Sequence, residues 1–203
     1  MLMVSTAFKP AVSRVIRPIA VAAHRLGVTP DMVTIFGALG GTVSSLYFFS
    51  QGDFFLGTIF VSLFALSDLF DGAIARVSEQ GPSKWGGFLD STCDRITDSS
   101  MLVGVSIYLT SQGDLLSPVV LASLAMGSLV PYIRAKAEAL KIECAVGLAE
   151  RTERIIITLT AIGLDGLGVP YALAIGFWIL FVASTVTVIQ RILVVRKGLR
   201  ADV

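Results

Sequence analysis

Apolar residues follow one another in six long runs, and polar residues gather in the short stretches between them. The runs cover residues 33–50, 54–76, 87–111, 116–139, 153–167 and 170–194. A helix needs about 20 mostly apolar residues to cross the roughly 30 Å of bilayer hydrocarbon, and the run at 153–167 is short of that length. The pattern predicts an all-α integral membrane protein whose six transmembrane helices form a bundle over residues 30–196.

The stretches between the runs contain residues that favour turns. They read Gln51-Gly52-Asp53, Gln112-Gly113-Asp114 and Asp165 to Pro170. Residues 4–26 mix apolar and basic side chains, with two prolines, which predicts an amphipathic helix lying on the membrane surface. Gly27 is expected to end this helix, and Thr29-Pro30-Asp31 to open the first spanning helix. No repeat appears, so residues 1–203 are expected to form a single domain.

Composition and charge strengthen the membrane assignment and orient the chain. Hydrophobic residues make up 54% of the chain and charged residues 15%, with a mean hydropathy of +0.80, which excludes an ordinary soluble domain. The turns near residues 52, 113 and 166 lack Lys and Arg, whereas both termini and the loops at 77–86 and 140–152 are basic. The positive-inside rule therefore predicts a multi-pass protein of the cell membrane with both termini in the cytoplasm. No cleavable signal peptide and no nucleic-acid partner are expected.

Four aspartates interrupt the second and third apolar runs at their cytoplasmic ends. Asp68 and Asp71 are three residues apart, and Asp90 and Asp94 are four apart, so each pair is expected on one helix face. A charge within a membrane span costs about 3 kcal/mol on insertion scales, and four neighbouring acids repel one another unless cations lie between them. Ligand sets with oxygen alone favour Mg²⁺, Mn²⁺ or Ca²⁺. The pattern predicts a metal centre at the cytoplasmic membrane face.

The residues beside these acids indicate a phosphate ligand. Gly72 removes a side chain where a ligand must approach, and Arg76 supplies a fixed positive charge. This combination favours two Mg²⁺ or Mn²⁺ ions on a pyrophosphate, with one acid accepting a proton from an attacking hydroxyl. Ion pairs of the acids with Arg76 or Arg95 are the alternative, but four acids outnumber these two bases.

The acids and their neighbours form the pattern D-x-x-D-G-x-x-A-R-(nine residues)-G-x-x-x-D-x-x-x-D, which begins at Asp68. It resembles the signature of the CDP-alcohol phosphotransferases, and the likeness extends over nearly the whole chain. The resemblance implies an enzyme that moves the phosphatidyl group of a CDP-linked lipid to an alcohol and releases CMP, and it implies a homodimer.

The resemblance also implies roles for individual residues. Asp68, Asp71 and Asp90 would bind the first metal ion, and Asp68, Asp90 and Asp94 the second. Asp94 would also be the proton acceptor. The residues expected to contact CDP-diacylglycerol are Asp31, Met32, Val33, Thr34, Gly72, Arg76 and Ser83.

A second group of basic residues indicates how the acceptor alcohol is bound. Arg134, Arg154 and Arg191 come from three predicted helices at one cytoplasmic level, and arginine forks bind phosphate well. A phosphorylated acceptor is therefore expected. Simple membrane anchoring is the alternative, and it suffices for Arg196, Lys197 and Arg200. Asp98 lies one turn beyond Asp94 and is expected to support neighbouring side chains or helix pairing, while the roles of Lys136 and Arg151 stay open.

Two segments resemble one subgroup of this family. Y-I-R-A-K-A-E-A at 132–139 and G-L-A-E-R-T-E-R at 147–154 are similar to segments of actinobacterial phosphatidylinositol phosphate synthases, which join CDP-diacylglycerol to inositol 1-phosphate. The subgroup is expected to have Lys at position 134 and Pro at position 152. Arg134 keeps the positive charge, whereas Thr152 makes the loop less rigid.

Other functions fit parts of the pattern. A related enzyme acting on glycerol 3-phosphate, which makes phosphatidylglycerol phosphate, would need the same metal centre. A divalent-cation transporter would explain the acids but not Gly72, Ala75 and Arg76. A structural membrane protein would explain only the G-x-x-x-G spacing at residues 37–41, which is expected to support helix packing within the chain or, alternatively, in a dimer.

Overall fold

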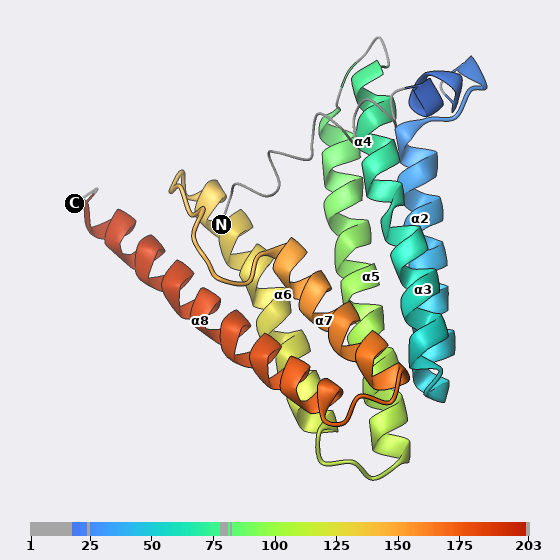
Figure 1. The fold of residues 1–203 in the computed structure, drawn as a ribbon. Coiled ribbons are helices and arrows are strands. Elements are labelled where there is room, and N and C mark those ends of the chain that lie inside the picture. Colours follow the sequence, from blue (N-terminus) through green and yellow to red (C-terminus); the bar gives the residue numbers. More distant parts are fainter. Residues whose placement is uncertain (1–17, 24, 78–80, 82, 202–203) are drawn as a thin grey trace. The chain divides into compact units, whose positions relative to one another are not determined.

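The protein is described by a computed structural model that covers residues 18–23, 25–77, 81 and 83–201. A short helical segment occupies residues 18–23. The later elements in this part of the chain are all helical: α2 (Pro30–Ser44), the π-helix η1 (Ser45–Phe49), α3 (Phe54–Ala65), α4 (Ser67–Val77), α5 (Lys84–Ser111), α6 (Ser117–Ala139), α7 (Arg151–Gly166) and α8 (Ala172–Ala201) (Figure 1). Most of the predicted amphipathic helix at 4–26 lies outside the described residues.

Four helical stretches are long and apolar enough to cross a membrane, which agrees with the all-α membrane class. They are Pro30–Phe49, Phe54–Arg76, Ser117–Ala139 and Ala172–Arg200. The third and fifth apolar runs also form helices, α5 and α7, but neither is among these four. Three aspartates, one arginine and one lysine lower the hydropathy of α5, and α7 has only 16 residues. That the chain crosses the membrane six times therefore stays a prediction.

Helix boundaries follow the turn residues closely, with one interruption that the apolar pattern hides. Thr29 caps α2, because its hydroxyl oxygen accepts a hydrogen bond from the Met32 N–H at 3.2 Å. Gly52 and Gly113 adopt φ of 83° and 68° in the predicted turns. The run at 54–76, expected as one helix, is interrupted at Leu66, and the Ser67 hydroxyl donates to the Phe64 carbonyl at 2.6 Å there. Asp68 thus lies in the first turn of a separate helix, α4.

The chain divides into two compact units, the first of which contains residues 1–43 and 60–97. Its core includes Ala20, Ala73 and Ile74, with Val33 and Phe70 packed against them. The glycines of α2 lie against other helices of this unit: a Cβ would collide with Ser67 at Gly37 and with Phe64 at Gly40, and would touch Thr97 at Gly41. The G-x-x-x-G spacing therefore supports packing within the chain, as predicted.

The second unit contains residues 44–59 and 98–203. Within it α8 packs against both α6 and α7 (Figure 1). A Cβ at Gly176 of α8 would lie 2.2 Å from the Ala161 Cβ, so the missing side chain lets α7 and α8 approach closely. On the other side of α8, the Ser123 hydroxyl donates to the Phe177 carbonyl at 3.3 Å.

The segment between α6 and α7 is fastened to α8 by a threonine. The Thr187 hydroxyl oxygen accepts hydrogen bonds from the N–H groups of Leu148 at 3.1 Å and Ala149 at 3.0 Å. Gly147 has φ of 148°, and a Cβ there would lie 2.4 Å from the Thr187 methyl carbon. This segment therefore has a defined path, and it leads directly into the arginines at the start of α7.

Candidate functional site

Three aspartates converge in the first unit. Asp68 lies in the first turn of α4, and Asp90 and Asp94 lie one turn apart on α5. One carboxylate oxygen from each lies within 4.8 Å of those of the other two. Oxygens on opposite sides of one ion are about 4 to 5 Å apart when metal–oxygen distances are 2.0–2.6 Å. The three half-buried carboxylates therefore fit a hard divalent cation, and their mutual repulsion favours one.

Asp71 is buried, and its carboxylate contacts protein groups. It accepts a hydrogen bond from the Thr34 hydroxyl at 2.6 Å and another from the Gly72 N–H. Thr34, predicted to contact the nucleotide, therefore also ties α2 to the signature helix α4. The convergent group contains Asp68, Asp90 and Asp94, and metal ligation by Asp71 stays a prediction.

The basic neighbours of the acids take two different positions. Arg95 forms an ion pair with Asp94, with Nη2 and Oδ2 3.8 Å apart, so one of the four acids does have a basic partner. Arg76 instead lies beside Gly72, where an added Cβ would come within 3.5 Å of its Nη1. The exposed Arg76 guanidinium thus borders an open backbone surface, which suits the approach of a phosphate.

The other residues predicted to contact the nucleotide divide into two groups. Ser83 accepts a hydrogen bond from the Gly86 N–H at 2.9 Å, and the Asp31 Oδ1 would lie 3.7 Å from a Cβ at Gly86. Asp31, Ser83 and Gly86 are therefore neighbours, with no bulky side chain between them. Met32 is exposed, whereas the Val33 side chain packs against the core of the unit, which leaves its backbone as the part able to meet a ligand.

Arg191 is buried in the second unit and holds three chain segments together. It is 2% exposed; its Nε donates to the Val146 carbonyl at 2.8 Å and its Nη1 to the Val130 carbonyl at 2.7 Å. Its Nη2 lies 3.8 Å from the Glu150 Oε1. These contacts join α6, the segment before α7, and α8. Glu150 was not predicted in this role, because no spacing rule connects it to Arg191.

Arg154 is held close to the same segment. Its Nη1 donates to the Ala149 carbonyl at 3.2 Å, and its Nε lies beside Gly127, where an added Cβ would be in ordinary contact at 3.7 Å. Arg134 differs, because it is half exposed and pairs with Glu138 at 3.1 Å. Arg134 lies one turn of α6 after Val130, whose carbonyl accepts a hydrogen bond from Arg191. Helices α6, α7 and α8 therefore each contribute one of the three predicted arginines to the second unit.

Asp98 connects two arginines of α7. Its Oδ2 lies 3.4 Å from the Arg154 Nη2, and its Oδ1 lies 3.7 Å from the Arg151 Nε. Asp98 was expected to support neighbouring side chains, and these contacts identify Arg151 and Arg154 as those side chains. Their i,i+3 spacing on α7 could have indicated that the two arginines share a face, but a carboxylate from α5 could not be matched to them by spacing.

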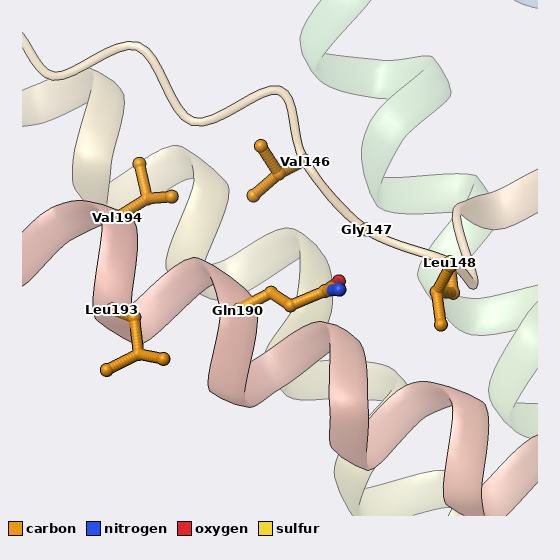
Figure 2. Close-up of a pocket in the computed structure, with 6 residues that line it drawn as sticks. All are labelled: Val146, Gly147, Leu148, Gln190, Leu193 and Val194. Atoms are coloured by element: carbon orange, nitrogen blue, oxygen red, sulfur yellow. The ribbon is translucent and has the colours of Figure 1, made fainter.

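A groove of about 340 Å³ lies between the segment before α7 and helix α8 (Figure 2). Its lining residues are Val146, Gly147, Leu148, Gln190, Leu193 and Val194. The Gln190 Oε1 is buried and has no hydrogen-bond partner within the described part of the chain. Because the lining carries no charge, the groove is unsuited to a phosphorylated alcohol, although Arg191 is adjacent to Gln190 in sequence.

Comparisons with known proteins agree with these features. The chain matches the profile of the family described as CDP-alcohol phosphatidyltransferase over residues 27–189. It is 42% identical to the phosphatidylinositol phosphate synthase of Streptomyces avermitilis over 194 residues, which are 91% of this chain and 79% of that protein. It is 39% identical to the synthase of that name from Cutibacterium acnes, over 94% of this chain and 97% of that one.

Solved structures of a mycobacterial protein have the same fold. The phosphatidylinositol phosphate synthase of Mycobacterium tuberculosis with CDP-DAG bound is 37% identical, with a TM-score of 0.86 over 90% of this chain and 94% of that chain. The same synthase in complex with manganese and citrate has a TM-score of 0.83 at 38% identity, over 89% of this chain and 88% of that chain.

Proposed function

Because the chain belongs to the CDP-alcohol phosphatidyltransferase family, we propose that it transfers the phosphatidyl group of CDP-diacylglycerol to inositol 1-phosphate. The products are phosphatidylinositol phosphate and CMP. The observation that carries this proposal is the convergence of Asp68, Asp90 and Asp94 within 4.8 Å beside the helix that bears Gly72 and Arg76. The names of the similar proteins favour inositol phosphate as the acceptor.

Divalent ions are part of the proposal. Asp68, Asp90 and Asp94 would hold one Mg²⁺ or Mn²⁺ ion, and Asp71 would complete a second ligand set with Asp68 and Asp90. When bound, the two ions would polarise the pyrophosphate and stabilise its leaving oxygen. The manganese in a structure of the M. tuberculosis synthase supports a divalent metal, and the all-oxygen donor set is suited to either ion.

The chain's own residues would orient the substrates and move one proton. An inositol hydroxyl attacks the lipid-side phosphorus of CDP-diacylglycerol, a new O–P bond forms, and the bond from that phosphorus to the bridging oxygen breaks. Asp94 takes the hydroxyl proton, and CMP leaves with the bridging oxygen. Gly72 and Arg76 would contact the diphosphate, while Asp31, Thr34, Ser83 and the backbone at Met32 and Val33 would position the nucleotide.

The acceptor would be recognised through its phosphate. Arg134, Arg154 and Arg191 are the proposed ligands, and the burial of Arg154 and Arg191 supports binding of an anion in a poorly solvated place. Because Arg191 already donates to two carbonyls, its Nη2 edge is the part proposed to meet the phosphate.

The membrane arrangement completes the proposal. The six apolar runs support six membrane crossings, and the positions of the basic residues support termini and a site on the cytoplasmic side. A cytoplasmic membrane face is where a soluble sugar phosphate can meet a lipid donor. A homodimer is proposed on the family resemblance alone, and cross-linking in membranes would test it.

Arg154→Ala is expected to raise the KM for inositol 1-phosphate by about 10- to 100-fold, because one hydrogen-bonded charge pair contributes about 1.5–3 kcal/mol. The KM for CDP-diacylglycerol should change little. Steady-state CMP release in liposomes measures both constants, with Arg196→Ala as the matched control, since Arg196 is exposed near the end of α8. An equal loss towards both substrates would indicate that Arg154 serves only the fold.

An acceptor panel tests the proposed specificity. Purified protein with CDP-diacylglycerol and Mg²⁺ is expected to release CMP at least about tenfold faster with inositol 1-phosphate than with unphosphorylated inositol, because the missing phosphate removes charge-assisted hydrogen bonds to the arginines. Turnover of glycerol 3-phosphate without turnover of inositol 1-phosphate would identify a phosphatidylglycerol phosphate synthase instead. Uptake of divalent ions into liposomes without CMP release would identify a transporter.

A further inference from the structure

Two arginines of α7 meet on a single carboxylate that belongs to α5. The oxygens of Asp98 are divided between them, Oδ1 at 3.7 Å from the Arg151 Nε and Oδ2 at 3.4 Å from the Arg154 Nη2. We propose that Asp98 is a positioning residue that sets Arg151 and Arg154 side by side as one binding surface for the acceptor phosphate. The proposal adds Arg151 to the acceptor site, and it rests on the proposed function.

The need for such a residue follows from charge. Arg151 and Arg154 are three residues apart, so they are neighbours on one face of α7, and two guanidinium groups there repel each other. Their surroundings differ, because the Arg151 side chain is 30% exposed and the Arg154 side chain 9% exposed. The Asp98 carboxylate, whose side chain is 18% exposed, lowers this repulsion because both guanidinium groups contact it.

The arrangement leaves the pair suited to an anion. Asp98 reduces the charge of the two arginines from +2 to +1, which still attracts a phosphate. A guanidinium has five N–H donors in a planar fork, so one carboxylate oxygen engages only part of it. Arg154 also donates to the Ala149 carbonyl, so this carbonyl and Asp98 together orient its guanidinium.

Removing the Asp98 charge acts on the KM for the acceptor in two opposite ways, so the direction in which this KM changes shows which effect dominates. Loss of a negative charge near the acceptor phosphate would by itself lower the KM for the acceptor. Loss of the ordered pair of arginines would raise it. We expect positioning to dominate, because the pair is open to solvent at Arg151, where water screens the simple charge effect.

The test is Asp98→Asn in the full chain, reconstituted in liposomes with CDP-diacylglycerol and Mg²⁺. We expect the KM for inositol 1-phosphate to rise about tenfold and the KM for CDP-diacylglycerol to change less than twofold. Asp98→Glu, which keeps the carboxylate, should recover most of the loss. Asp53→Asn is the control, because Asp53 is exposed in the turn before α3. An unchanged or lower KM for the acceptor, or an equal rise for both substrates, would overturn the proposal.

A double-mutant comparison identifies the route of the effect. If Asp98 acts through the arginines, Asp98→Asn should raise the acceptor KM less in an Arg151→Gln background than in the wild type. An undiminished effect would contradict this route. Should Asp98→Asn fail to fold, Arg151→Gln alone decides: a selective rise in acceptor KM supports the proposal, and no rise overturns it.

Binding of inorganic phosphate separates this proposal from the proposed function. Phosphate is expected to raise the thermal stability of the wild type more than that of Asp98→Asn, whichever alcohol the enzyme uses. If the wild type does not turn over inositol 1-phosphate but this difference persists, the acceptor assignment fails and the role of Asp98 stands. If both proteins respond equally to phosphate, the role of Asp98 fails.

Discussion

Replacement of Asp94 by Asn is expected to lower the rate of CMP release by about 10²- to 10⁴-fold, the range that a general base contributes. The amide keeps the size of the side chain and an oxygen that faces Asp68 and Asp90, but it cannot accept the hydroxyl proton. Steady-state CMP release at saturating concentrations of both substrates measures the loss directly.

The proposed roles of Asp94 can be separated experimentally. Because Asp94 belongs to the convergent group of carboxylates, its replacement will also weaken metal binding. Activity should remain low when Mg²⁺ or Mn²⁺ is raised to saturation, since more metal cannot replace a missing proton acceptor. Full recovery at high metal concentration would show that Asp94 is a ligand only. Asp53→Asn, a change of the same kind on an exposed turn, should leave the rate unchanged.

Removal of divalent metal is expected to abolish CMP release, by about a thousandfold or more, and Mg²⁺ or Mn²⁺ should restore it. The physical reason lies in the convergence of three carboxylates within 4.8 Å, which repel one another without a cation. Treatment with a chelator followed by addition of each ion measures the effect. Full activity in excess chelator would contradict it.

Thermal stability gives a second measurement of the same metal centre. A ligand that binds only the folded state at 100 times its Kd stabilises that state by about 2.7 kcal/mol. Mn²⁺ should therefore raise the unfolding temperature of the wild type and raise that of Asp90→Asn markedly less. Equal shifts in both proteins would place the ion elsewhere in the chain.

The spacing of the acids predicted much of the convergent carboxylate group. Asp90 and Asp94 are separated by one helical turn and do share a face with access to Asp68, as expected. Asp71 is on the same side of α4 as Asp68, since three residues turn a helix by about 300° and leave the two within about 60° of each other, and metal ligation by Asp71 stays a prediction. Its hydrogen bond from Thr34 depends on how α2 packs against α4, which the local pattern does not contain.

The arginines show why the rest could not be predicted. Arg191 was expected to bind the acceptor phosphate, and that role stays a prediction. Its contacts proved to be the carbonyls of Val130 and Val146, and every residue carries a carbonyl, so no residue type marks them beforehand. The break at Leu66 was missed although Ser67 and Asp68 follow it directly, because no Gly or Pro marks the position.

Formation of the product lipid is the most direct test of the central claim. Purified protein in liposomes with CDP-diacylglycerol and Mg²⁺ is supplied with inositol 1-phosphate labelled in its phosphate, and the label in the lipid fraction is measured together with CMP. We predict that labelled phosphatidylinositol phosphate and CMP appear in equal amounts, and that Asp94→Asn forms both at least about 10²-fold more slowly. Release of CMP with no label in lipid, or no dependence on inositol 1-phosphate, would contradict the account.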